Sequence, residues 1–117
     1  MKYLIVDNKE DMTKIIQQAV CTEEDIIVEC SDGDEAVDVY AKLQPDIVLM
    51  DIRMKNMNGI QATKIILEQF PDACILIITD YDSPAFRNAA KNAGATAFFS
   101  KENLIQVKDF INNGVLK

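Results

Sequence analysis

The chain has 117 residues, of which 49% are hydrophobic, and a formal net charge of −7. This length suffices for one domain with a single core, and the hydrophobic content excludes a disordered chain. The acidic balance disfavours direct binding of nucleic acid and suits a metal cation or a basic partner surface.

Strands and helices are predicted to alternate from the first residues onward. Lys2–Val6 is an apolar run without alternation, which indicates a strand buried on both faces. A second strand follows at Ile26–Cys30, and Ser31 and Asp32 can cap the helix after it. Between these strands, residues 9–20 have helical spacing. The predicted apolar face of that helix consists of Met12, Ile15, Ile16 and Ala19.

The alternation continues through the middle of the chain. Pro45 ends the second helix, because the residue before a proline avoids helical geometry. The third strand is Ile47–Met50, Gly59 opens the third helix, and Cys74–Ile78 is the fourth strand. The predicted buried side of the third helix consists of Ile60, Thr63, Leu67 and Phe70.

The last third of the chain carries clear helix boundaries. Ser83-Pro84 is a typical helix start, and Gly94 a typical stop. The fifth strand is Ala97–Phe99, and Asn103 is expected to cap a final helix. Two aliphatic residues fall off the predicted core faces and are expected to be exposed, namely Val37 and Ile105.

Five β-α units in strict alternation imply a parallel sheet with right-handed crossovers and helices on both faces. The expected fold is therefore α/β, a flavodoxin-like (βα)5 doubly wound sheet with strand order 2-1-3-4-5. In this order the first and third strands are neighbours. Residues 1–117 are expected to form one such domain.

Four predicted strands stop at residues that could do chemistry. Asp7, Asp51, Thr79 and Lys101 each lie at or within two residues of a strand end. Because parallel strands end at the same edge, these side chains should meet where open α/β sheets bind ligands. Two carboxylates there suit Mg²⁺, and a carboxylate can attack phosphorus. Asp51, at the centre of the edge, is the better nucleophile candidate. An ammonium and a hydroxyl suit the phosphoryl oxygens.

The whole chain resembles the receiver domain of response regulators in bacterial two-component systems. It is most similar to the subgroup whose members carry helix-turn-helix DNA-binding output domains. The stretches that carry the resemblance are YLIVDN, DIVLMDIRMKNMNGIQAT, ILIITDYD and NAGATAFFSKENL.

The resemblance implies a role for each matching residue. Asp51 would accept a phosphoryl group from a phosphohistidine of a sensor kinase. Lys101 and Thr79 would bind the phosphoryl oxygens, and Phe98 would be the aromatic switch that turns inward when Thr79 moves. The implied Mg²⁺ ligands are Asp7, Asn8, Asp51 and the backbone carbonyl of Arg53.

The resemblance also implies partners and a setting. The expected partners are a sensor histidine kinase and an output domain or downstream protein, with transcription as the expected output. Homodimerisation on phosphorylation is compatible with the resemblance. No enzymatic activity is expected beyond weak autophosphorylation and hydrolysis of the aspartyl phosphate. Free thiols at Cys30 and Cys74, together with the absence of a membrane-spanning or signal stretch, favour the cytoplasm.

Three neighbours of the site residues depart from the family pattern. Asn8 replaces a second acid, which predicts weaker Mg²⁺ binding. Asp80 stands where a small residue is usual and adds negative charge beside the site. Glu102 replaces a proline that often follows a cis bond, so a trans Lys101-Glu102 bond is expected.

Asn8 and Asp80 leave one alternative open, a pseudo-receiver that binds partners without phosphorylation. Two other functions of similar folds are disfavoured. A flavodoxin needs a phosphate loop after the first strand, where this chain has the acidic sequence DNKED. A haloacid-type phosphatase needs a second acid at the position of Arg53.

Overall fold

A computed structural model describes residues 1–114 and shows a five-stranded sheet. The strand order is β2-β1-β3-β4-β5, and all neighbouring strands are parallel, which confirms the predicted flavodoxin-like α/β fold. The strands are β1 (Lys2–Val6), β2 (Ile26–Cys30), β3 (Ile47–Met50), β4 (Ile75–Thr79) and β5 (Ala97–Ser100).

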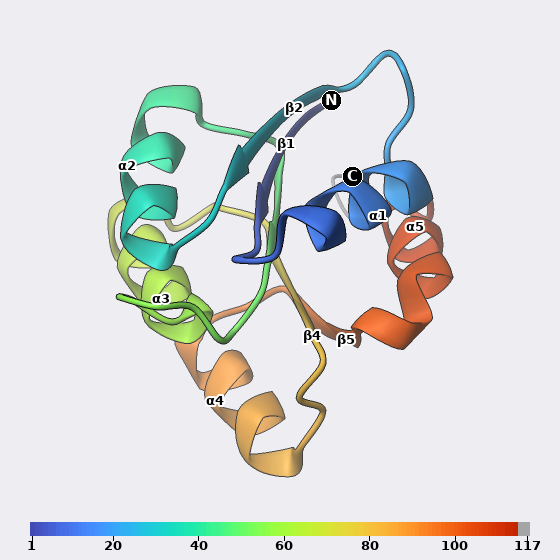
Figure 1. Cartoon of the computed structure of the whole chain (residues 1–117). Helices are drawn as coiled ribbons and strands as arrows, with labels where there is room; N and C mark the ends of the chain where they lie inside the picture. Colours follow the sequence, from blue (N-terminus) through green and yellow to red (C-terminus); the bar gives the residue numbers. More distant parts are fainter. Residues whose placement is uncertain (115–117) are drawn as a thin grey trace.

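Helices cover both faces of the sheet. Figure 1 shows α2, α3 and α4 on one side and α1 and α5 on the other. None of the helices within residues 1–114 is long and apolar enough to cross a membrane. The helices are α1 (Glu10–Val20), α2 (Gly33–Leu43), α3 (Gly59–Gln69), α4 (Pro84–Ala93) and α5 (Leu104–Asn112), with a 3₁₀ turn, η1 (Lys101–Asn103), before α5.

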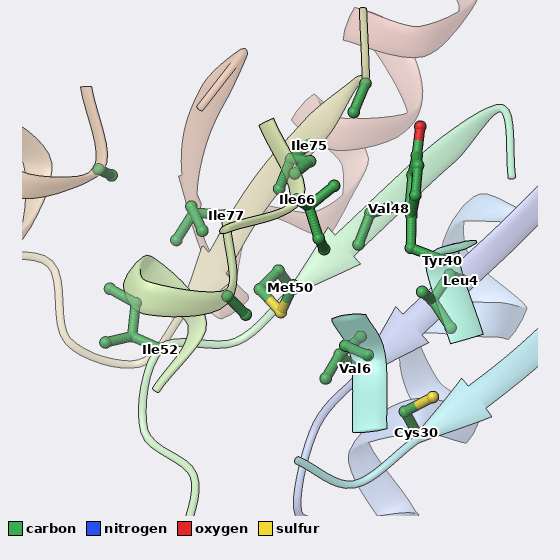
Figure 2. Close-up of a cluster of buried hydrophobic side chains, with 14 residues drawn as sticks. Leu4, Val6, Cys30, Tyr40, Val48, Met50, Ile52, Ile66, Ile75 and Ile77 are labelled. Atoms are coloured by element: carbon green, nitrogen blue, oxygen red, sulfur yellow. The ribbon is translucent and has the colours of Figure 1, made fainter. Parts of the chain in front are cut away.

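Each face of the sheet has its own hydrophobic core. Alternate residues of a strand point to opposite faces, so Leu4 and Val6 join one core and Tyr3 and Ile5 join the other. Figure 2 shows the core under α2, α3 and α4, where Ile66 of α3 lies among side chains of β3 and β4. Because both of their faces are buried, β1, β3 and β4 read as nearly continuous apolar runs.

Two strands and one helix differ slightly from their predicted bounds. β4 begins one residue later than expected and includes Thr79, and β5 extends to Ser100. These two polar residues are register partners in the ladder between the strands. The predicted strands stopped at the last apolar residue, but backbone hydrogen bonding continues past it. α1 begins at Glu10, one residue later than expected.

The predicted helix faces were partly wrong. Ile15 is 49% exposed, because α1 turns Thr13, Ile16 and Val20 toward the sheet and thus includes a polar residue in its buried face. Val37 is half-buried against the core rather than exposed, whereas Ile105 is 72% exposed as predicted.

The buried face of α3 was also predicted incompletely. Besides Thr63, it buries Ala62 and Ile66, which the prediction omitted. The other three predicted residues are only partly buried against the same core, namely Ile60, Leu67 and Phe70.

The helix caps follow the sequence except at the last helix. The Ser83 hydroxyl accepts the Phe86 N–H at 3.2 Å, and Gly94 ends α4 with φ 98°. Asn103 was wrongly predicted as a capping side chain, because it makes no cap hydrogen bond. The inserted 3₁₀ turn moves the cap upstream, where the Ser100 hydroxyl accepts the Glu102 N–H at 3.2 Å.

Truncation of a core residue tests this packing. We expect Ile77→Ala to lower the free energy of unfolding by about 2–5 kcal/mol, since the fully buried side chain would leave a cavity between β4 and the helices. Urea denaturation measures the change. The matched control, Ile105→Ala on the exposed face of α5, should change it by less than ~0.5 kcal/mol. Equal losses in the two variants would contradict the core assignment.

Candidate functional site

The backbone ladder brings the two predicted carboxylates together. Val6 and Met50 are register partners in the β1–β3 pair, so Asp7 and Asp51 follow at the same level. The Asp51 N–H donates to the Val6 carbonyl at 2.9 Å. The sheet therefore fixes both residues beyond the last apolar layer, and both carboxylates are buried.

Lys101, which follows the edge strand β5, contacts both carboxylates. Its Nζ lies 2.7 Å from Asp7 Oδ2 and 3.3 Å from Asp51 Oδ2. Lys101 opens the 3₁₀ turn after β5, and its side chain is buried. Burial of an ammonium costs free energy of desolvation. The attraction of two carboxylates offsets this cost when their geometry is fixed, as it is here by the strands.

The electrostatics of the site reflect this crowding. Burial raises the pKa of the Asp51 carboxyl; the Lys101 charge opposes the shift and the Asp7 charge adds to it. For Lys101, burial alone lowers the pKa, but contacts with Asp7 and Asp51 outweigh it and raise the pKa above its usual value. Two acids thus share one cation.

Thr79 and Phe98 flank this cluster on β4 and β5. Thr79 is completely buried, and its Oγ1 accepts the Tyr81 N–H at 3.1 Å. Phe98 is half-buried on the face covered by α4, with the Arg87 guanidinium 4.8 Å from its ring centroid. The hydroxyl therefore holds the start of the β4–α4 loop, and the aromatic ring lies beside the helix that follows this loop.

The other two predicted metal ligands, Asn8 and Arg53, have side chains outside the buried cluster of Asp7, Asp51 and Lys101. Asn8 is exposed and lines a surface hollow together with Asp7 and Glu10. The Arg53 guanidinium lies 3.8 Å from the ring centroid of Tyr81. Its side chain thus stacks on the β4–α4 loop, and its backbone carbonyl is the part of Arg53 that is a ligand candidate.

The structure adds two residues that support the loop after Asp51. The buried Asp32 carboxylate accepts the N–H groups of Asn56 and Met57 at 2.9 and 3.1 Å. A Cβ on Gly59 would lie 1.8 Å from the Asp51 carbonyl oxygen, so only glycine lets α3 begin there. The sequence marked these residues as a cap and a helix start, but gave no sign of their contact with the site loop.

The donor set fits Mg²⁺ rather than a softer metal. Asp7 Oδ2 is buried and lies 2.7 Å from Lys101 Nζ, but none of the donors in the described part of the chain is aligned with it for a hydrogen bond. Across residues 1–114, no group of three His, Cys, Asp or Glu side chains is arranged to hold a metal ion. Two carboxylates with an amide nearby suit a hard ion that keeps several waters.

Comparison with known proteins assigns the chain to a family. The family model for the response regulator receiver domain matches residues 3–111. The chain therefore belongs to the receiver-domain family of response regulators, the class that its fold and its strand-end site define.

Individual relatives agree with this assignment. The chain is 38% identical over 104 residues to the uncharacterized transcriptional regulatory protein YhcZ of Bacillus subtilis, covering 87% of the chain and 49% of YhcZ. It is 37% identical over 101 residues to the chemotaxis protein CheY of Thermotoga maritima, covering 86% and 84%. A crystal structure of the CheX-CheY-BeF3-Mg+2 complex from Borrelia burgdorferi superposes with a TM-score of 0.87 at 26% identity, covering 100% of this chain and 90% of that one. The chain spans about half the length of the transcriptional regulators it matches.

The charge balance of the site predicts a pH-dependent change in stability. Because the pKa of Asp51 is raised in the folded protein, the stability it contributes is present at low pH and lost as pH rises through that pKa. Asp51→Asn should therefore raise the free energy of unfolding at pH 7 by about 1 kcal/mol, since a single buried acid, Asp7, then lies beside the ammonium. Urea denaturation at a series of pH values measures the difference.

The gain should vanish below about pH 4, where unfolded aspartate also becomes protonated. The control is Asp38→Asn, on an exposed position of α2. A gain that persists unchanged at low pH would contradict the proposed charge crowding.

Proposed function

We propose that this chain is the phosphoacceptor domain of a two-component signalling system and that Asp51 is the acceptor. The observation that carries the proposal is the single Lys101 ammonium, with Nζ 2.7 Å from Asp7 Oδ2 and 3.3 Å from Asp51 Oδ2. A buried cation beside a nucleophilic carboxylate is the arrangement that a transferring phosphoryl group requires. The family assignment supports the same function.

The chemistry is transfer of a phosphoryl group from the phosphohistidine of a sensor histidine kinase. A carboxylate oxygen of Asp51 forms the new O–P bond, while the P–N bond breaks and its electron pair returns to the imidazole. Asp51 Oδ1 accepts the Ile52 N–H at 2.8 Å, which orients the carboxylate and leaves Oδ2 toward Lys101. The Lys101 ammonium and the Thr79 hydroxyl then hold the phosphoryl oxygens.

Mg²⁺ belongs to the proposed site. Its role is to offset the charge of the carboxylates and of the phosphoryl oxygens. Asp7 Oδ2, which accepts no hydrogen bond from residues 1–114, and the crowded acid pair support this assignment. The ligands that would hold it are Asp7, Asn8, Asp51 and the backbone carbonyl of Arg53.

Phosphorylation would change the surface formed by α4, β5 and α5. Thr79 Oγ1 accepts the N–H of Tyr81, so a move of Thr79 toward the phosphoryl group would release the start of the β4–α4 loop. Phe98 would then turn inward as the switch residue. Slow hydrolysis of the aspartyl phosphate resets the domain, which otherwise has no enzymatic role.

The output is proposed to be control of transcription in the cytoplasm. The relatives that support this are transcriptional regulators about twice as long as this chain. The downstream partner is a DNA-binding output domain or another protein, and phosphorylated receivers would pair as homodimers. With its net charge of −7, this domain would not bind nucleic acid directly.

Labelling by a small phosphodonor tests the acceptor role. The protein incubated with acetyl phosphate and Mg²⁺ should show a retarded band in phosphate-affinity electrophoresis. Asp51→Asn should abolish the shift, because the amide cannot form the acyl phosphate. Asp82→Asn, on the nearby β4–α4 loop, should keep it.

A shift that survives in Asp51→Asn would place the acceptor elsewhere. No shift in the wild-type protein would instead support a receiver that works without phosphorylation.

The amide at position 8 should limit metal affinity. We expect Asn8→Asp to tighten Mg²⁺ binding by about tenfold, because one added charge beside a divalent cation contributes more than ~1 kcal/mol even in water. An NMR titration of backbone amides with MgCl₂ measures the dissociation constant. Asn113→Asp adds the same charge at the end of α5 and should leave the affinity unchanged. Equal affinities of Asn8→Asp and the wild type would exclude Asn8 as a ligand.

A further inference from the structure

Asp80 adds a third carboxylate to a site that already holds two. Its Oδ2 lies 3.8 Å from Lys101 Nζ, and the Lys101 side chain is only 3% exposed. The Asp80 side chain itself is 49% exposed. Asp7 and Asp51 therefore contact the buried ammonium from within, and Asp80 approaches it from the solvent side.

A second cation also contacts Asp80. Lys9 Nζ also lies 3.8 Å from Asp80 Oδ2. Lys9 follows β1 and Asp80 follows β4, and these two strands flank β3 in the sheet. The ion pair thus connects the loops on either side of the strand tip that presents Asp51.

The neighbouring acid of the same loop behaves differently. Asp82 is paired with the Arg87 guanidinium through both carboxylate oxygens. This bidentate pair satisfies Asp82 within the loop and the first turns of α4. Asp80 has no such local partner and instead shares the cation of the site, so the two acids form a matched pair for comparison.

We propose that Asp80 is a specificity-determining residue, which disfavours free phosphodonors in proportion to their negative charge. The inference rests on the proposed role of Asp51 as acceptor. A donor must bring its phosphoryl oxygens to Lys101, and Asp80 both repels these oxygens and competes for the ammonium. A donor that carries more negative charge meets a larger barrier.

The expected size of the effect follows from simple electrostatics. At roughly 6 Å in water, each unit of donor charge facing Asp80 changes the rate by about threefold. A dianion and a monoanion should therefore differ by a further factor of about three because of this residue. Salt at 1 M, with a screening length of about 3 Å, should remove most of this difference.

Two small donors of different charge separate this effect from others. Acetyl phosphate is a dianion at pH 7, and phosphoramidate is largely a monoanion. In each reaction the Asp51 carboxylate forms an O–P bond, while the P–O bond to acetate or the P–N bond to ammonia breaks. The readout is the ratio of the two second-order labelling rates at saturating Mg²⁺, measured at low and at high salt for the wild type, Asp80→Asn and Asp82→Asn.

Asp80→Asn should raise the ratio of the acetyl phosphate rate to the phosphoramidate rate by about threefold at low salt, and at high salt the wild type and Asp80→Asn should have nearly the same ratio. Asp82→Asn should keep the wild-type ratio throughout. An unchanged ratio in Asp80→Asn, or the same rise in both variants, would overturn the proposal. Equal acceleration with both donors would also overturn it, because it would show that Asp80 acts only by covering the site.

A titration with Mg²⁺ alone separates this proposal from the acceptor role. Asp80→Asn should weaken Mg²⁺ binding about twofold or more, because a carboxylate near the site is lost, and Asp82→Asn should not. If neither donor labels the wild type, the acceptor role of Asp51 fails. An unchanged Mg²⁺ affinity in Asp80→Asn would then also overturn the placement of Asp80 in the site.

Discussion

The buried ammonium of Lys101 is the interaction on which the rest of the site depends. Asp7 and Asp51 lie side by side on adjacent strands, and without a cation their charges would repel each other in a poorly solvated position. Lys101 follows β5, at one edge of the sheet, and its side chain reaches the carboxylates that follow β3 and β1. One side chain therefore links the ends of the first, third and fifth strands at the sheet edge that carries the candidate site.

The site carries more negative than positive charge, and several residues contribute to this excess. Three acids face Lys101, and a second cation, Lys9, pairs with the outermost of them, Asp80. A divalent cation would redress this imbalance, and an incoming phosphoryl group would worsen it. Metal binding and phosphoryl transfer are thus expected to be coupled, because both change the charge balance around Lys101.

The loop between β4 and α4 connects this charge cluster to the surface. Its three successive residues each contact a cationic side chain: Asp80 contacts lysines of the site, Tyr81 lies under Arg53, and Asp82 pairs with Arg87. Arg87 also lies over the ring of Phe98. A change in charge at Asp51 therefore has a short physical route to the α4–β5 face, through contacts that each depend on a cation.

The sequence by itself determined the fold class, the strand order and the four polar residues, Asp7, Asp51, Thr79 and Lys101, that lie at one edge of the sheet. It could do so because buried parallel strands leave uninterrupted apolar runs, and polar residues that end such runs must share one edge. Only the tertiary structure decided which side of α1 is buried, because a polar Thr13 lies in that face. It alone also revealed the ties of Asp32 to the site loop and of Asp80 to Lys101, since these contacts join residues more than 20 positions apart and leave no periodic signal in the chain.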